Sequence, residues 1–448
     1  MNKEKFLKIT RYIGEKINQT EFENRTYAVG GSVRDFVMGN EIKDIDLVVE
    51  LPNGGILLAQ YFEQIGLTKG SVVVYPTYGT AMFHLKEFPD DEIEVVQTRG
   101  EQYHEETRNP ETCYASILED AFRRDLTINA LYYNLTTGEI EDYTQKGLND
   151  IKNHLIRVTN NNPDIVFNDD PLRILRVIRF ATKFDWEIEE ATRLSMVKNK
   201  NRLSIITQER ITDEFSKILT CKYPEKGLEL IDEIVGLENI VDVFNVKCNC
   251  LRKDPVFDKI LNVVMCTNNH LDERLAALLY LFNDACIFET LKKMKYPNKV
   301  IESVLTLDDP KLVNGFLCEY DNYKHNKPNK MDKEISKMQH VLGSRDMFLK
   351  YIDLHSSICE ANNEDGDFVF VLYDRIEKGS INMYNYVLPV DGNDIMETLE
   401  IEPSREVEVA KKLLFNLAYE NNKITKEQCV SWLKENKDFI KFSTNILK

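Results

Sequence analysis

The chain has 448 residues, 43% of them hydrophobic and 29% charged, which is the composition of a globular protein with roughly two to four domains. It contains no run of about 18 apolar residues, and its charged N-terminal segment lacks the apolar stretch of a signal peptide. We therefore exclude a membrane protein and expect a cytoplasmic one. The formal net charge of −17 argues against nonspecific attraction to nucleic acid, although a local basic face is compatible with it.

The nine cysteines are scattered along the chain, and this odd number predicts free thiols in a reducing compartment. Cys248 and Cys250 form the one close pair. Because no second pair or histidine cluster lies nearby, we expect thiols here rather than a zinc site.

Strand and helix patterns alternate over the first 145 residues. A helix is predicted over residues 3–18, a strand for TYAVGG, and a helix for SVRDFVMG that ends at Gly39. Further elements are predicted in chain order: a buried strand over 44–50, a helix over 55–67, two strands within 71–85 and a strand over 92–98. This alternation indicates a mixed α+β domain with a small sheet.

The pattern changes after this domain. Residues 99–122 are polar and have no sustained period, so we expect a long functional or mobile loop there. From Asp170 onwards, apolar residues recur at intervals of three and four, which predicts helices. We therefore predict a mixed N-terminal domain over 1–155, a helical segment over 156–235 and a helical remainder over 236–448.

Two aspartates lie at the start of the strand over 44–50. Asp44 and Asp46 are separated by one residue, so both project from the same strand face, with Cβ atoms about 6.6 Å apart. Divalent cations would relieve their mutual repulsion. An isolated pair of this kind is more often an exposed acidic strand end, so its context has to decide between the two interpretations.

The context is a glycine turn that opens a helix. Gly30 and Gly31 allow a ligand to approach the backbone closely, and the N–H groups at the start of the following helix attract phosphate. A phosphate cradle followed by a pair of metal-binding carboxylates is an arrangement suited to holding a nucleoside triphosphate for attack at its α-phosphorus.

Five motifs in sequence order resemble one family. They are GGSVRD with DIDL, RRDLTINAL (123–131), DYTQKGLND (142–150), DDPLRILRVIRFA (169–181) and ERITDE (209–214). Together they resemble the class II branch of the polymerase-β-type nucleotidyltransferases, which contains tRNA CCA-adding enzymes and bacterial poly(A) polymerases. The resemblance is weaker beyond residue 219, where LPVDGNDIMETLEIEPSREV (388–407) is similar to a further family element. It implies a polymerase-β-like head over 1–155, a helical neck over 156–235 that recognises the base, and a helical body and tail that bind tRNA.

The resemblance also implies roles for individual residues. Asp44 and Asp46 would hold two Mg²⁺ or Mn²⁺ ions, and Glu94 on a neighbouring strand would be a third acidic side chain near the metals, although an exposed strand carboxylate is an equal alternative. The residues implied to hold the β- and γ-phosphates are Gly30, Gly31, Ser32 and Arg34. Those implied to contact the ribose and triphosphate are Arg124, Asp125 and Asn129.

Base selection is implied for the motif DDPLR. Asp170 and Arg173 are three residues apart, which would place them on one helix face, where a carboxylate and a guanidinium can read the edges of cytosine and adenine. The chain departs from the family pattern by having Asp169 where a glutamate is usual, and by one extra residue before Gly147. Arg176 and Arg179 would either support the base-reading pair or contact RNA phosphate, and the sequence leaves this choice open.

Longer family members carry a metal-dependent phosphohydrolase domain, but Tyr280 and Leu281 stand where its histidine and aspartate would bind metal. We therefore expect a helical body that either binds RNA or has a purely structural packing role, without that activity. The basic stretch 321–333 is either a tRNA contact or a solvated loop.

The predicted function is template-independent addition of CCA to tRNA 3′ ends from CTP and ATP, with pyrophosphate released. A poly(A) polymerase, or an enzyme that adds only CC or only A, is the alternative within the family. A noncatalytic RNA-binding relative and a phosphohydrolase are alternatives of other classes. No membrane and no obligate protein partner is indicated.

Overall fold

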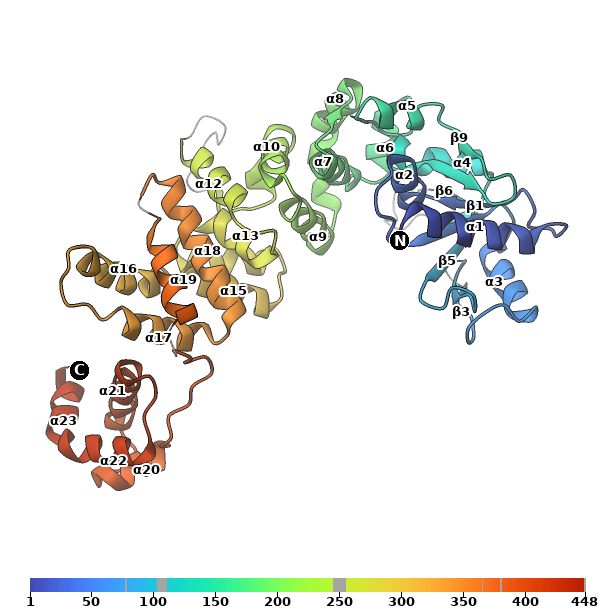
Figure 1. The fold of residues 1–448 in the computed structure, drawn as a ribbon. Helices are drawn as coiled ribbons and strands as arrows, with labels where there is room; N and C mark the ends of the chain where they lie inside the picture. The colour runs from blue at the N-terminus through green and yellow to red at the C-terminus, as the bar shows by residue number, and fades with distance from the viewer. Residues whose placement is uncertain (77–78, 103–110, 245–254, 365, 379–380, 447–448) are drawn as a thin grey trace. The chain divides into compact units, whose positions relative to one another are not determined.

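The computed structural model describes all residues except 77–78, 103–110, 245–254, 365, 379–380 and 447–448 (Figure 1). Cys248 and Cys250 therefore lie outside the described residues. The chain forms two compact units, Met1–Asp242 and Val243–Lys448. The first contains the sheet and the second contains helices in its described part, so the predicted mixed α+β fold with a helical remainder is confirmed.

A seven-stranded mixed sheet forms the first part of the N-terminal unit, in the order β3-β4-β5-β2-β1-β8-β9. Its strands are β1 (Thr26–Val29), β2 (Ile45–Val49), β3 (Val73–Tyr75), β4 (Thr80–His84), β5 (Glu92–Gln97), β8 (Leu131–Asn134) and β9 (Ile140–Asp142). Only β2 and β5 pair in parallel, and the other neighbours are antiparallel. The last three residues of β2 are fully buried, which explains their continuous apolar sequence.

Helices pack on this sheet and continue beyond it. α1 (Lys3–Ile17) presents Phe6, Ile9 and Ile13 to the core, all without solvent exposure. The Phe6 ring lies 5.0 Å from Phe36 of α2 (Gly31–Met38) and 5.6 Å from Tyr133 of β8, between centroids. Other helices of this unit are α3 (Gly54–Gln64), α4 (Ile117–Arg123), α5 (Gly147–Lys152), α6 (Pro163–Asp169), α7 (Arg173–Phe184), α8 (Glu190–Asn199), α9 (Gln208–Leu219) and α10 (Pro224–Ile234).

The expected loop over 99–122 is wrong for the part that the structure describes. β6 (Arg99–Gln102) and β7 (Glu111–Tyr114) pair as an antiparallel ribbon, and α4 follows. The ribbon strands have few apolar residues because they pair only with each other, so they show no periodicity. α4 begins with a capping box in which Ser116 and Glu119 bond reciprocally. Residues 103–110 lie outside the described part.

Gly147 is required by a close approach between two motifs. Gly147 opens α5, and a Cβ added there would lie 2.5 Å from the carbonyl oxygen of Thr127. The Thr127 hydroxyl donates to Asp150 at 2.7 Å, and Asp150 also pairs with Arg157. The motif DYTQKGLND thus docks its helix against RRDLTINAL.

We expect Gly147→Ala to lower the free energy of unfolding by about 1 to 3 kcal/mol, because the new methyl group must displace backbone in a packed interior. Urea unfolding of the purified protein measures this loss. Gly366→Ala is the control, since its new methyl would meet nothing nearer than the Ser356 hydroxyl at 3.9 Å. Equal stability of the Gly147 variant and the parent would contradict the predicted clash.

The described part of the C-terminal unit is helical. Its helices are α12 (Pro255–Cys266), α13 (Leu271–Leu279), α14 (Asp284–Lys293), α15 (Asn298–Asp308), α16 (Lys311–Lys324), α17 (Met331–Leu342), α18 (Arg345–Ala361), α19 (Phe368–Lys378), α20 (Gly392–Leu399), α21 (Arg405–Asn421), α22 (Lys426–Glu435) and α23 (Lys437–Ile446). No helix among the described residues is long and apolar enough to cross a membrane.

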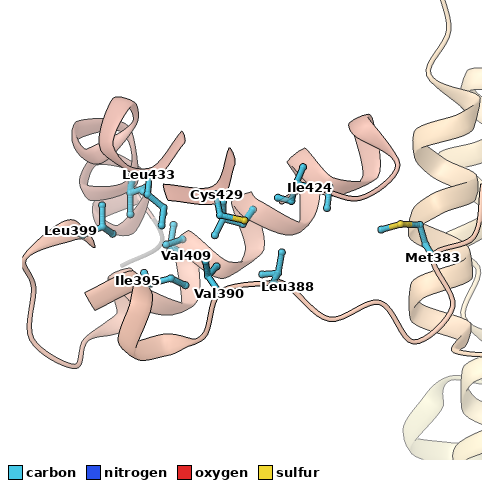
Figure 2. Packing of buried hydrophobic residues seen from close by; sticks show 13 residues of the cluster. Met383, Leu388, Val390, Ile395, Leu399, Val409, Ile424, Cys429 and Leu433 are labelled. Atoms are coloured by element: carbon cyan, nitrogen blue, oxygen red, sulfur yellow. The ribbon is translucent and has the colours of Figure 1, made fainter. Parts of the chain in front are cut away.

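The last helices enclose a core of their own. Figure 2 shows this cluster, in which Ile395 of α20, Val409 of α21 and Leu433 of α22 are buried together. Asp391 caps α20 through a capping box with Asp394, which explains why the 388–407 element contains these aspartates. In the basic stretch 321–333, Lys333 pairs with Glu420 at 2.7 Å, so part of its charge serves packing between helices.

Candidate active site

The glycine turn joins β1 to α2 as predicted. Gly30 has a φ of +70°, a conformation that favours glycine, and it precedes the first turn of α2. The first N–H groups of a helix have no intrahelical acceptor, so they are available to an anion. The Ser32 hydroxyl donates to the Val29 carbonyl at 2.8 Å and holds the turn against β1.

The acidic residues meet beside this turn. Parallel pairing of β2 with β5 places Asp46 directly opposite Glu94, while Asp44 lies just before β2. Burial, followed by the charges of Glu94 and Asp44, raises the pKa of Asp46 to about 6, although the positive charge of Arg124 opposes this shift. The three carboxyl groups are therefore close enough to repel one another.

These carboxylates fit a hard divalent cation. Mg²⁺ prefers oxygen ligands and is commonly held by one or two carboxylates together with substrate phosphates and water. A cation here would relieve the repulsion that raises the Asp46 pKa. Among the described residues, no group of three or more His, Cys, Asp or Glu side chains is arranged to hold a metal ion by itself.

Arg124 lies close to the glycine turn, and its positive charge also acts on Asp46. A Cβ added to Gly30 would be 3.5 Å from its Nη1. Its Nε and Nη2 donate to Asp120, and Nε also donates to the Tyr132 hydroxyl at 3.0 Å. Although burial opposes it, the carboxylate of Asp120 raises the pKa of Arg124, so the cation is fixed at the turn.

A chain of buried and partly buried polar side chains connects three of the motifs. Arg34 donates to both carboxylate oxygens of Asp35 and to the Asn129 amide oxygen at 2.6 Å. Asn129 in turn donates to Asp125 at 3.0 Å, and Arg176 donates to the other oxygen of Asp125. Burial alone would raise the pKa of Asp125, but Arg176 and Asn129 lower it to about 2.

The series of polar contacts continues into helices α7 and α9. Glu214 of α9 is buried and accepts contacts from Arg179 at 2.7 Å and Arg176 at 3.6 Å. Phe180 and Phe184 of α7 lie 5.3 Å and 5.1 Å from the Arg34 guanidinium carbon, measured to their ring centroids. α2, RRDLTINAL, α7 and α9 are thus joined by charge and by aromatic contact.

Asp170 and Arg173 lie at the start of α7, but not on one helix face. Asp170 has extended backbone angles between α6 and α7, while Arg173 is the first residue of α7. The cause is Pro171, which disfavours helical geometry in the preceding residue. Asp170 accepts from Arg210 at 3.0 Å and from the Leu172 amide, whereas Arg173 donates to the Arg123 carbonyl at 2.7 Å.

The structure therefore assigns most of the predicted residues to two groups, to which Asp170 and Arg173 do not belong. The first group lies at the glycine turn and the start of β2, and consists of Gly30, Gly31, Ser32, Asp44, Asp46, Glu94 and Arg124. Arg34, Asp125, Asn129, Arg176 and Arg179 form the buried connection, with their polar atoms directed to one another.

Comparison with known proteins identifies the family. Residues 26–157 match the poly A polymerase head domain family, and residues 185–241 match the family described as the probable RNA and SrmB-binding site of polymerase A. The chain is 30% identical over 347 residues to the CCA-adding enzyme of Ligilactobacillus salivarius, covering 70% of this chain and 80% of that protein. The chain belongs to the CCA-adding enzyme family.

Two other similarities extend this result. The mitochondrial CCA tRNA nucleotidyltransferase of Saccharomyces cerevisiae is 34% identical over 226 residues, and the match covers 47% of this chain and 41% of the yeast protein. The chain thus spans about two fifths of that relative. The crystal structure of the Bacillus stearothermophilus CCA-adding enzyme with CTP has the same fold, with a TM-score of 0.72 at 19% identity, covering 97% of this chain and 98% of that one.

Within this CCA-adding family member, sequence reasoning missed Asp120 and Tyr132. The Asp120 carboxylate is fully buried and accepts from Arg123, Arg124, the Tyr132 hydroxyl and the Arg99 amide. Its position three and four residues before the two arginines was the available signal, since such spacings bring side chains together on a helix. Glu214 was quoted within a motif without a role, and the structure places it between Arg176 and Arg179.

Proposed function

We propose that this chain adds CMP, CMP and AMP in turn to the 3′ end of tRNA, using CTP and ATP and releasing pyrophosphate. The observation that carries the proposal is the pairing of Asp46 with Glu94 beside the Gly30 turn, in a chain of the CCA-adding family. Metal-binding and phosphate-binding groups are thereby next to each other, as nucleotidyl transfer requires.

Two Mg²⁺ or Mn²⁺ ions, held by Asp44 and Asp46 with Glu94 nearby, would neutralise the triphosphate and activate the RNA 3′ hydroxyl. The backbone N–H groups at Gly31 and Ser32 would donate to the phosphates, and Arg124 beside the turn would add a positive charge. Arg34 would act indirectly, by holding α2 in place beneath the phosphates, because its guanidinium donates to Asp35 and Asn129.

The buried connection would position the base-reading residues. Arg176 and Arg179 bond to Asp125 and Glu214, which favours the supporting role over an RNA phosphate contact. Asp125 and Asn129 would carry the ribose contact at the edge of the same network. Asp170 and Arg173 would select cytosine or adenine by the exocyclic amino group of the base. The base would replace the contact of Asp170 with Arg210 and the contact of Arg173 with the Arg123 carbonyl.

A single assay tests the proposal against its alternatives. The purified protein is incubated with Mg²⁺ and a tRNA transcript that lacks its last three nucleotides, first with each nucleoside triphosphate alone and then with CTP and ATP together. Two additions with CTP and a third with ATP present are expected. Long runs of added AMP would indicate a poly(A) polymerase. Arrest after two additions would indicate a CC-adding enzyme, and absence of any incorporation would indicate a noncatalytic relative.

Arg173→Ala is expected to reduce discrimination between CTP and UTP by about tenfold or more, because a charged hydrogen-bonding group in base selection is lost. Rates of single-nucleotide addition with each nucleoside triphosphate measure this ratio. Arg202→Ala is the matched control, since Arg202 also donates to a backbone carbonyl, that of Asn168, but is exposed. Unchanged selectivity in the Arg173 variant would refute the base-reading role.

The yeast relative is named as mitochondrial, while the sequence of this chain led us to expect a cytoplasmic protein. We keep the cytoplasm as the proposed location, and fluorescence microscopy of the tagged full chain tests it.

A further inference from the structure

The C-terminal unit contains a cavity of about 320 Å³. It lies between the end of α13, the start of α14, the end of α15 and the middle of α18. Polar groups in its lining come from Tyr280, Asn283, Asp284, Asp308 and His355, and apolar surface comes from Phe282, Pro310 and Ile358. Its volume is at the lower end of the roughly 300 to 1,000 Å³ usual for small-molecule pockets.

Asp308 is a buried carboxyl group in this lining. It is only 9% exposed, and no hydrogen bond or positive charge acts to lower its pKa. Burial, together with the nearby charges of Asp284 and Asp309, raises the pKa of Asp308 to about 8. No lysine or arginine lines the cavity. An uncompensated buried carboxyl group is costly, and a cation would compensate it.

The other lining groups suit an organic cation. The Tyr280 hydroxyl oxygen is buried without a partner among the described residues, so it can accept a hydrogen bond. Phe282 and Tyr280 supply aromatic faces, which attract cations, and Ile358 supplies apolar contact. Asp284 is exposed and lies at the start of α14, so it adds negative charge on the solvent side.

A metal ion fits less well. Burial lowers the pKa of His355 to about 4, so this ring is neutral at physiological pH. Its Nε2 lies 3.2 Å from the Leu307 carbonyl oxygen, which can only accept, so Nε2 carries the proton and is not a ligand. The described residues contain no set of three or more acidic, histidine or cysteine side chains arranged around a metal.

We propose that this cavity binds a small organic ammonium compound, with its charged head on Asp308 and Tyr280 and its apolar part against Phe282 and Ile358. This site lies in the C-terminal unit and does not depend on the proposed nucleotidyl transfer.

Isothermal titration of the full chain with butylammonium chloride tests the proposal, at about pH 9 so that Asp308 is ionised. Saturable binding is expected, and uncharged butanol is expected not to bind. Asp308→Asn should weaken butylammonium binding about tenfold or more, because the charged acceptor is lost. Asparagine resembles the protonated acid, so this variant should keep the melting temperature of the parent.

Asp321→Asn is the matched control and should bind like the parent, since Asp321 is an exposed acid of α16 outside the cavity. If Asp308→Asn unfolds, Tyr280→Phe replaces it, and weaker binding with an unchanged melting temperature supports the site. The proposal would be overturned if the parent showed no saturable binding, or if both cavity variants bound butylammonium as tightly as the parent. Displacement of butylammonium by magnesium chloride would also overturn it.

Discussion

Replacing Asp46 with asparagine is expected to slow CMP incorporation about a thousandfold or more, since several kcal/mol of charge stabilisation by metal ions would be lost. Asp46 is the strand residue directly opposite Glu94, in the group of carboxylates proposed to hold the metal ions. Single-turnover addition of CMP to a shortened tRNA measures the rate. Binding of tRNA, measured by filter retention, should be nearly unchanged.

The same variant should be at least as stable as the parent in metal-free buffer. The pKa of Asp46 is raised in the folded protein, so its ionisation costs stability as the pH rises through about 6. Asparagine removes that cost at neutral pH. Glu87→Gln, an exposed acid outside the site, is the control for both measurements. A fully active Asp46 variant would refute the assignment of the metal site, and a misfolded one would refute the stability argument.

Asp120→Ala is expected to lower the free energy of unfolding by about 3 to 5 kcal/mol, the usual cost of removing one partner of a buried ion pair. Arg123, Arg124 and Tyr132 all donate to this carboxylate, which has no solvent exposure. Urea unfolding at neutral pH measures the loss. Asp213→Asn, which removes an exposed pair with Lys217, should cost less than about 1 kcal/mol.

The effect of Asp120 should also depend on pH. Burial opposes ionisation, but Arg124 and Arg123 hold the pKa of Asp120 well below its usual range. A lowered pKa stabilises the fold above the unfolded value of about 4, and that stability is lost as the pH falls further. The difference in unfolding free energy between parent and Asp120→Ala should therefore shrink in acid. A difference that stays constant down to about pH 2 would contradict this role.

Local sequence was sufficient to predict the positions of site residues that lie close together along the chain. Gly30 and the start of α2 are neighbours in sequence, and the buried apolar run that follows Asp46 indicated the strand β2. The family and the mixed fold followed from the order of such short motifs. Helix and strand patterns reflect burial on one face, so they are visible in one segment at a time.

The residues that were not predicted depend on distant partners. Arg34 could be read as a phosphate ligand because nothing near it in sequence indicates Asn129, which lies 95 positions away. The β6–β7 ribbon left no periodic signal, since neither strand packs into the seven-stranded sheet. Pro171 indicates that Asp170 is not helical, so that Asp170 and Arg173 do not share a helix face. The prediction considered only their three-residue spacing, which is typical of a shared face.

The buried connection joins segments that leave the ribosome at different times, so it affects how the N-terminal unit folds during synthesis. Translation produces β1 long before β8, its antiparallel neighbour, and produces Asp125 long before Arg176 and Glu214, which complete its charge network. A nascent chain that ends near residue 155 therefore has its sheet but still holds a buried carboxylate without its cation. The N-terminal unit should thus acquire its final stability only after α9 has left the ribosome, and expression fragments should extend to Asp242.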